Sequence, residues 1–190
     1  MTEHDGITDN ARAREEDYFR KRDRELIERM RQASGADAMR RQLEATTGLH
    51  DPALLRDLEE LGFTPATIGL LPLVPIVQVA WAEGGVSNAE RKLLVQLARA
   101  RGIEPGSAAD LRLAEWMDRR PGADVFARAT RLIRAMLDSP SEERGDLSAD
   151  DLIKYCESIA AASGGILGLG RISAEERATL AQIASALKSK

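Results

Sequence analysis

The sequence predicts an all-α protein: a compact helical bundle with a pseudo-repeat of helical hairpins, preceded by a long, projecting, charged N-terminal helix. Helix start signals recur along the chain, either an N-cap residue followed by Pro or a Ser followed three residues later by Glu. Between these signals the apolar residues follow the spacing of amphipathic helices, and no segment reads as a strand. Hydrophobic residues make up 43% of the chain and aromatic residues only 4%, so aliphatic side chains must fill the core.

The N-terminal helix is predicted at 11–47, after a disordered tail at 1–10. Fourteen of the 21 residues in 11–31 are charged, and neither Pro nor Gly interrupts that stretch. Phe19, Leu26 and Met30 form one narrow apolar stripe. Because this stripe is too narrow for a wide contact with a core, the helix should project into solvent, pair with another helix or bind something else. A weak break is expected at Ser34–Gly35.

A helical domain is predicted at 51–190. Asp51 and Pro52 start its first helix, and Pro72 and Pro75 divide an apolar central segment into a short turn and a main helix. Ser87 with Glu90, and Ser173 with Glu176, form capping boxes. The expected helices are 52–61, 75–83, 91–101, 108–119, 123–138, 140–144, 147–162 and 173–187.

The two capping boxes lie within an internal repeat. Residues 84–100 and 170–186 align at an offset of 86 residues, and the matches include Gly84 with Gly170 and Arg91 with Arg177. Any two capped amphipathic helices share part of this pattern. The preceding Gly and the Glu-Arg pair favour a genuine duplication, which would pack two related hairpins about a pseudo-twofold axis.

Residues 79–91, VAWAEGGVSNAER, resemble the signature of the TerB-like (tellurite-resistance) family, and the likeness extends over about 65–190. The resemblance implies a helical pseudo-repeat fold and a stress-response role, with acidic residues linked to metal. Glu83 stands where the family usually has Asp, and Leu169 occupies the matching place in the second copy. Glu83 and Glu90 could converge on Ca²⁺ or Mg²⁺. The alternative interpretation is that Glu90 and Glu176 only cap their helices.

The run Glu15-Glu16-Asp17-Tyr18-Phe19-Arg20, followed by Glu25-Leu26, resembles the inhibitory segment of the mitochondrial ATPase inhibitor family. The likeness covers about 20 residues; the gap before Tyr-Phe is shorter, and the family's histidine-rich tail is missing. The resemblance implies docking into the catalytic head of an F-type ATP synthase. It assigns apolar anchoring to Tyr18, Phe19 and Leu26, and salt bridges to Glu16, Arg20 and Glu25. Aromatic and Arg residues are common anchors when a helix docks, and Met30 extends the stripe.

Composition and motifs favour a non-enzymatic binding protein. The net charge of −4 argues against non-specific nucleic-acid binding. The uncharged segment 65–82 contains three prolines and suits a core element better than a membrane span. A single cysteine, Cys156, suits a reducing compartment, and we expect a cytoplasmic protein. No catalytic constellation is apparent. Three interpretations stay open: a regulatory protein that docks through its N-terminal helix, a metal-binding stress module, and a homodimer formed through that helix.

Overall fold

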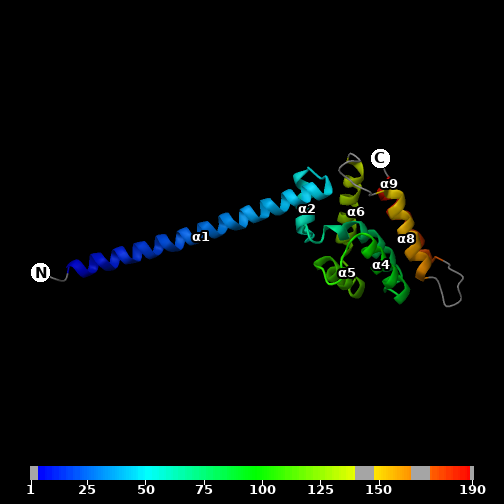
Figure 1. Ribbon diagram of the computed structural model, residues 1–190, viewed down its shortest axis with the longest axis horizontal. Coiled ribbons are helices and arrows are strands. Elements are labelled where there is room, and N and C mark those ends of the chain that lie inside the picture. Colours follow the sequence, from blue (N-terminus) through cyan, green and yellow to red (C-terminus); the bar gives the residue numbers. More distant parts are fainter. Residues whose placement is uncertain (1–3, 140–147, 164–171, 189–190) are drawn as a thin grey trace. The chain divides into compact units, whose positions relative to one another are not determined.

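The computed structural model describes residues 4–139, 148–163 and 172–188 (Figure 1). All regular elements in these ranges are helical, which confirms the predicted all-α class. The chain divides into two compact units, Met1–Arg41 and Gln42–Lys190. No helix in the described ranges is long and apolar enough to cross a membrane.

The first helix, α1 (His4–Thr47), begins earlier than predicted and has no break. It begins at His4, so residues 4–10 are helical where the sequence predicted a disordered tail, and it passes through Ser34–Gly35 without a break. No Pro occurs before Pro52, and a single Gly costs only about 1 kcal/mol relative to Ala in a helix interior. Long helical stretches on both sides of Gly35 can therefore outweigh its local preference.

The globular unit begins with the last turn of α1, at Gln42 rather than at the predicted boundary of 51. Leu43 and Thr47 are fully buried, and Leu49 is nearly so. The Thr47 hydroxyl donates to the carbonyl of Leu43 at 2.7 Å and accepts from the Leu49 amide at 3.3 Å. Gly48, with φ of 67°, ends the helix. Burial of this turn makes it part of the core.

Helix α2 (Pro52–Glu60) follows as predicted, because the Asp51 side chain accepts from the Ala53 amide at 2.8 Å. Next come the 3₁₀ helix η1 (Ile68–Leu73) and α3 (Val74–Ala80). Pro72 lies inside η1 and Pro75 lies in the first turn of α3, so the two prolines divide the apolar segment as expected. All residues of α3 except Gln78 are buried. This short helix is the centre of the unit.

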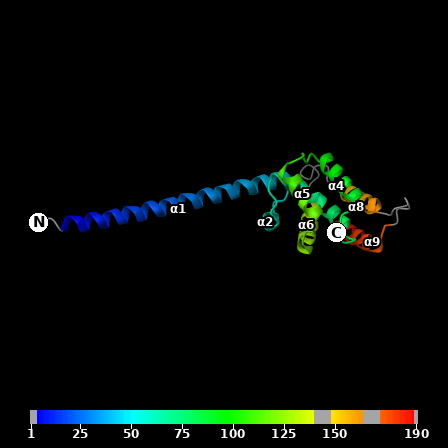
Figure 2. The ribbon, with the colours of Figure 1, turned by 90° about the horizontal axis from the view of Figure 1, so that it is seen from below.

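Five helices surround that centre or pack beside it: α4 (Asn88–Ala100), α5 (Ala108–Asp118), α6 (Ala123–Asp138), α8 (Ala149–Ser163) and α9 (Ala174–Lys188). Helix α3 contacts α4, α6, α8 and α9, and α5 contacts η1. Helix α8 also contacts both α4 and α9, and Figure 2 shows it between them. The predicted helix 140–144 and the glycine-rich loop 164–170 lie outside the described residues.

The two predicted capping boxes are both present. The Ser87 amide donates to Glu90 Oε2 and the Ser173 amide donates to Glu176 Oε2, each at 2.7 Å. The reciprocal bonds, from the Glu90 and Glu176 amides to the serine hydroxyls, are 3.3 and 3.1 Å long. Glu90 and Glu176 are 3% and 1% exposed, so the repeated motif forms the same buried cap twice.

Candidate functional site

The most unusual surface feature among the described residues is a set of large apolar side chains on α1 that remain in solvent. Tyr18, Leu26, Ile27 and Met30 are 55%, 52%, 48% and 64% exposed. Every described side chain from 20 to 38 is exposed as well. This part of α1 gains nothing from core burial, so packing within the described fold does not account for its large apolar side chains.

Four residues of α1 form a continuous row, which we call the α1 ridge: Tyr18, Arg22, Leu26 and Met30. Successive members are four residues apart, so they are neighbours on the helix surface. The Arg22 guanidinium donates to the Tyr18 hydroxyl at 3.2 Å and lies 5.8 Å from the centre of the Tyr18 ring. Rows of this spacing are the ridges that fit into grooves of another helix.

The remaining predicted partner-binding residues also lie on α1. Arg20 and Glu25 are exposed, and their carbonyls accept hydrogen bonds from Arg24 Nε at 3.2 Å and Arg29 Nε at 3.3 Å. Glu16 and Phe19 belong to the helix, but their side chains lie outside what the structure describes. The predicted salt bridges and the anchoring role of Phe19 stay predictions.

The charge of this part of α1 differs from that of the chain. Residues 20–31 contain six basic and three acidic side chains, a net charge of 6 − 3 = +3, whereas the whole chain carries −4. Basic side chains therefore outnumber acidic ones along the part of α1 that carries Arg22, Leu26 and Met30. A partner with a complementary, acidic rim would be attracted to it and oriented on it.

The predicted metal ligands Glu83 and Glu90 have very different surroundings. Glu83 is exposed, next to Gly84 with φ of 89°. Burial raises the pKa of Glu90 above its ordinary value, opposed by its hydrogen bonds to Ser87, and the charges of Glu176 and Glu83 raise it further. No group of three or more metal-binding side chains occurs within the described residues. The observed role of Glu90 is the helix cap, and its role in metal binding stays a prediction.

The single cysteine, Cys156, is buried. Its side chain is fully inaccessible, and burial raises the pKa of its thiol to about 12. A thiol with such a pKa is almost entirely protonated at neutral pH and is a poor nucleophile.

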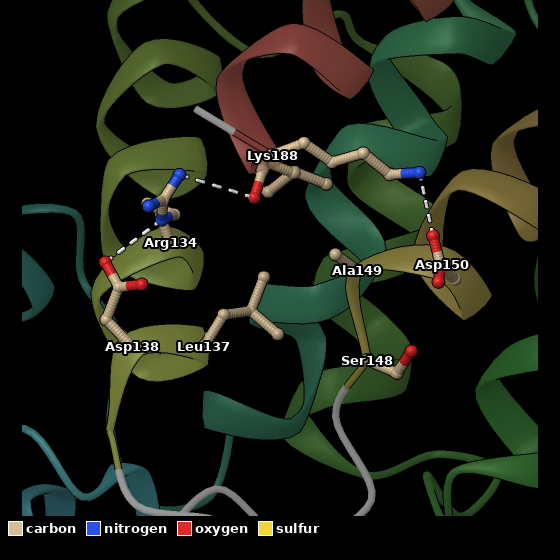
Figure 3. A pocket seen from close by; sticks show the side chains of 8 residues that line it. Arg134, Leu137, Asp138, Ser148, Ala149, Asp150 and Lys188 are labelled. Carbon is tan, nitrogen blue, oxygen red and sulfur yellow. Dashed lines mark hydrogen bonds and ion pairs between the residues drawn. The ribbon is translucent and has the colours of Figure 1, made fainter. Parts of the chain in front are cut away.

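A hollow of about 480 Å³ lies between the end of α6, the start of α8 and the end of α9 (Figure 3). Arg134 donates to the Asp138 carboxylate at 3.0 Å and Lys188 donates to Asp150 at 2.8 Å. Arg134 also donates to the carbonyl of Leu187 at 3.5 Å. Both cations are therefore engaged by protein acids. The described lining contains neither His nor Cys.

No protein-family model, curated protein or solved structure matched the chain. The class that the structure itself defines is an all-α protein with a separate, charged helical segment and a compact helical unit.

The sequence did not single out two features of this surface. Ile27 is apolar, and its residue type alone would favour burial. Its exposure next to the α1 ridge depends on what packs over this part of α1, which the neighbouring sequence does not show. The bond between Arg22 and Tyr18 could have been found from their four-residue spacing, because such pairs are neighbours on any helix.

Proposed function

We propose that this chain is a non-enzymatic regulatory protein that docks on a protein partner through the α1 ridge. The observation that supports the proposal is the exposure of Tyr18, Leu26 and Met30, each more than half accessible on a part of α1 where every described side chain is exposed. Burying one large aliphatic side chain contributes about 1.5–3 kcal/mol. Burial of the three large side chains Tyr18, Leu26 and Met30 would contribute binding free energy that offsets part of the cost of association.

The charges beside the α1 ridge favour a different protein over a second copy of the chain. In a coiled coil with Phe19, Leu26 and Ala33 at position d and Met30 at position a, Asp23 also falls at position a. A parallel homodimer would place the two Asp23 carboxylates opposite each other. An antiparallel homodimer would place the edge that carries Arg22 and Arg29 against itself. Both arrangements bring like charges together, which is destabilising.

The specific partner that we propose is the catalytic head of an F-type ATP synthase. Support comes from the resemblance of Glu15–Arg20 and Glu25-Leu26 to the inhibitory segment of the mitochondrial ATPase inhibitor family. The exposure of Tyr18 and Leu26 is what such docking requires. In this mechanism α1 enters an interface of the head and blocks rotary hydrolysis, and no residue of the chain takes part in chemistry.

The test is inhibition of ATP hydrolysis by the full chain, added to membranes of the organism that encodes it. We expect Leu26→Ala/Met30→Ala to raise the half-inhibitory concentration by at least about tenfold, because loss of two anchors costs more than about 1.4 kcal/mol. Leu111→Ala is the matched control, since Leu111 on α5 is an equally exposed aliphatic residue at 64%. It should leave inhibition unchanged.

Two results would contradict the proposal at different levels. If the native chain does not slow hydrolysis at any concentration, the ATP synthase is not the partner. If sedimentation shows a homodimer that Leu26→Ala/Met30→Ala dissociates, the α1 ridge is a self-association surface and the docking proposal is wrong.

A further inference from the structure

Arg101, at the C-cap of α4, differs from the other partly buried arginines of the globular unit. Each of the others donates hydrogen bonds from its guanidinium to a carbonyl or carboxylate. These donors and their acceptors are Arg91 to Met117, Arg99 to Asp110, Arg112 to Gly62, Arg128 to Asp57 and Arg134 to Asp138. Within the described ranges, the side chain of Arg101 makes no such bond and no ion pair.

Partial burial, with no hydrogen-bonding partner among the described residues, affects the pKa of Arg101. Burial lowers the pKa of its guanidinium, and the nearby Tyr155 and Asp151 only partly oppose that effect. A cation that is partly removed from water without gaining an anion loses part of its solvation, and no protein group of the described ranges replaces that part. A ligand anion beside Arg101 would supply the missing counter-charge.

A pocket of about 340 Å³ is present at this side chain. Leu97, Ala100 and Arg101 line it from α4, and Tyr155 lines it from α8. Leu97 and Arg101 are one turn apart on α4, and α4 packs against α8. The volume falls at the lower end of the range of small-molecule sites, about 300–1,000 Å³. The described part of the lining thus combines a cation, a phenol and two apolar side chains around a space that suits a small ligand.

Asp151 does not fill the role of counter-ion. It lies one turn before Tyr155 on α8, is exposed, and accepts from Lys154 Nζ at 3.5 Å. Its attraction for Arg101 is the smallest of the influences on that guanidinium. Its charge is screened by water and shared with Lys154, so it leaves Arg101 able to take another anion.

We propose that the pocket between α4 and α8 binds a small organic molecule through a carboxylate or phosphate group. The planar guanidinium of Arg101 would hold two oxygens of that group, and the Tyr155 hydroxyl would donate a further bond. Leu97 and Ala100 would contact the apolar part of the ligand. This site goes beyond the docking of α1 and does not depend on it, because all of its residues belong to the globular unit.

The experiment is a calorimetric titration of the full chain with butyrate, with inorganic phosphate and with butyramide as the uncharged control. A site with a Kd of about 1 mM would be about nine-tenths occupied at about 10 mM ligand. We expect at least one of the two anions to bind within that range, and the tighter one identifies the acidic group. Arg101→Gln should weaken binding at least about tenfold and Tyr155→Phe about threefold, whereas Arg119→Gln, at an exposed arginine on the C-cap of α5, should have no effect.

Three outcomes would overturn the proposal: no binding of either anion at about 10 mM, equal binding by the native chain and Arg101→Gln, or equal binding of butyramide and butyrate.

Thermal unfolding without ligand provides an independent measurement. A guanidinium without a partner adds nothing to the fold, so ligand-free Arg101→Gln should unfold at the native temperature or above it. A clearly lower unfolding temperature would show that Arg101 already stabilises the protein and would also refute the site.

Discussion

Replacement of Arg112 is the sharpest test of how the globular unit holds α2 and α5 together. From α5, Arg112 donates to the carbonyl of Gly62 at 2.6 Å and to that of Leu61 at 2.5 Å, just after the end of α2. Its guanidinium carbon also lies 4.7 Å from the ring centre of Phe63 and 4.9 Å from that of Trp116. One side chain therefore donates to the two carbonyls that follow α2 and covers two aromatic rings.

The expected loss follows from these contacts. A hydrogen bond from a charged donor contributes about 1.5–3 kcal/mol, and a cation–π contact at a partly exposed site about 0.5–1 kcal/mol. Arg112 is only half-buried, so water can replace part of what is lost. We therefore expect Arg112→Ala to lower the free energy of unfolding by about 2–3 kcal/mol, well below the sum of the contacts. Arg112→Lys keeps the charge but loses the planar fork, and it should still cost about 1–2 kcal/mol.

Urea unfolding followed by tryptophan fluorescence measures this loss where it arises. Trp116 lies edge-on to Phe63 at 6.2 Å, and the Trp81 indole donates to the carbonyl of Trp116 at 2.8 Å. Both tryptophans of the chain thus report on the same cluster. Arg119→Ala, at the exposed end of α5, is the control and should change stability by less than about 0.5 kcal/mol. An equally small effect of Arg112→Ala would show that the bonds and ring contacts of Arg112 contribute nothing net.

Two further substitutions test the burial of α1's last turn and of the capping box. Leu43→Ala removes a fully buried side chain. It should lower the free energy of unfolding, measured by urea titration, by about 2–4 kcal/mol. A loss below about 1 kcal/mol would place Leu43 outside the core. Burial raises the folded-state pKa of Glu90 above its ordinary 4.5, so ionised Glu90 lowers stability at neutral pH. Gln also suits a capping box, so Glu90→Gln should raise the urea midpoint at pH 7 relative to the native chain. This difference should disappear as the pH falls below 4.5, because Glu90 is then protonated in both the folded and the unfolded chain. A lower midpoint for Glu90→Gln at pH 7 would contradict the prediction.

Local signals in the sequence predicted most helix starts. Ser107, for example, accepts from the Asp110 amide at 3.2 Å, and the helix that it caps begins at Ala108 as expected. Gly62, with φ of 72°, lies after the end of α2 as the sequence indicated. These features depend on bonds that span three or four residues, so the residue types and their spacing are sufficient to predict them.

Contacts between distant residues could not be predicted in the same way. Arg112 and Gly62 are 50 residues apart, and the bond between them has no local pattern. The surroundings of Arg101 depend on where α8 packs, and only the fold shows that no acidic side chain of the described ranges forms an ion pair with its guanidinium. The continuity of α1 also depends on more than the local signal at Ser34–Gly35, because the helical segments on both sides of that pair determine whether the helix continues.

The division of the chain into two units determines how the binding experiments can be interpreted. The described side chains of 20–38 are exposed and contribute no burial to the core, so substitutions on the α1 ridge should leave the unfolding of the globular unit unchanged. Weaker inhibition of the partner by Leu26→Ala/Met30→Ala would then result from the loss of the docking surface and not from unfolding of the globular unit. Because α1 is already helical in the chain alone, the partner would not have to order it, and more of the binding free energy would remain as affinity. Loss of docking together with an unchanged unfolding transition would therefore locate the function of α1 on its exposed ridge.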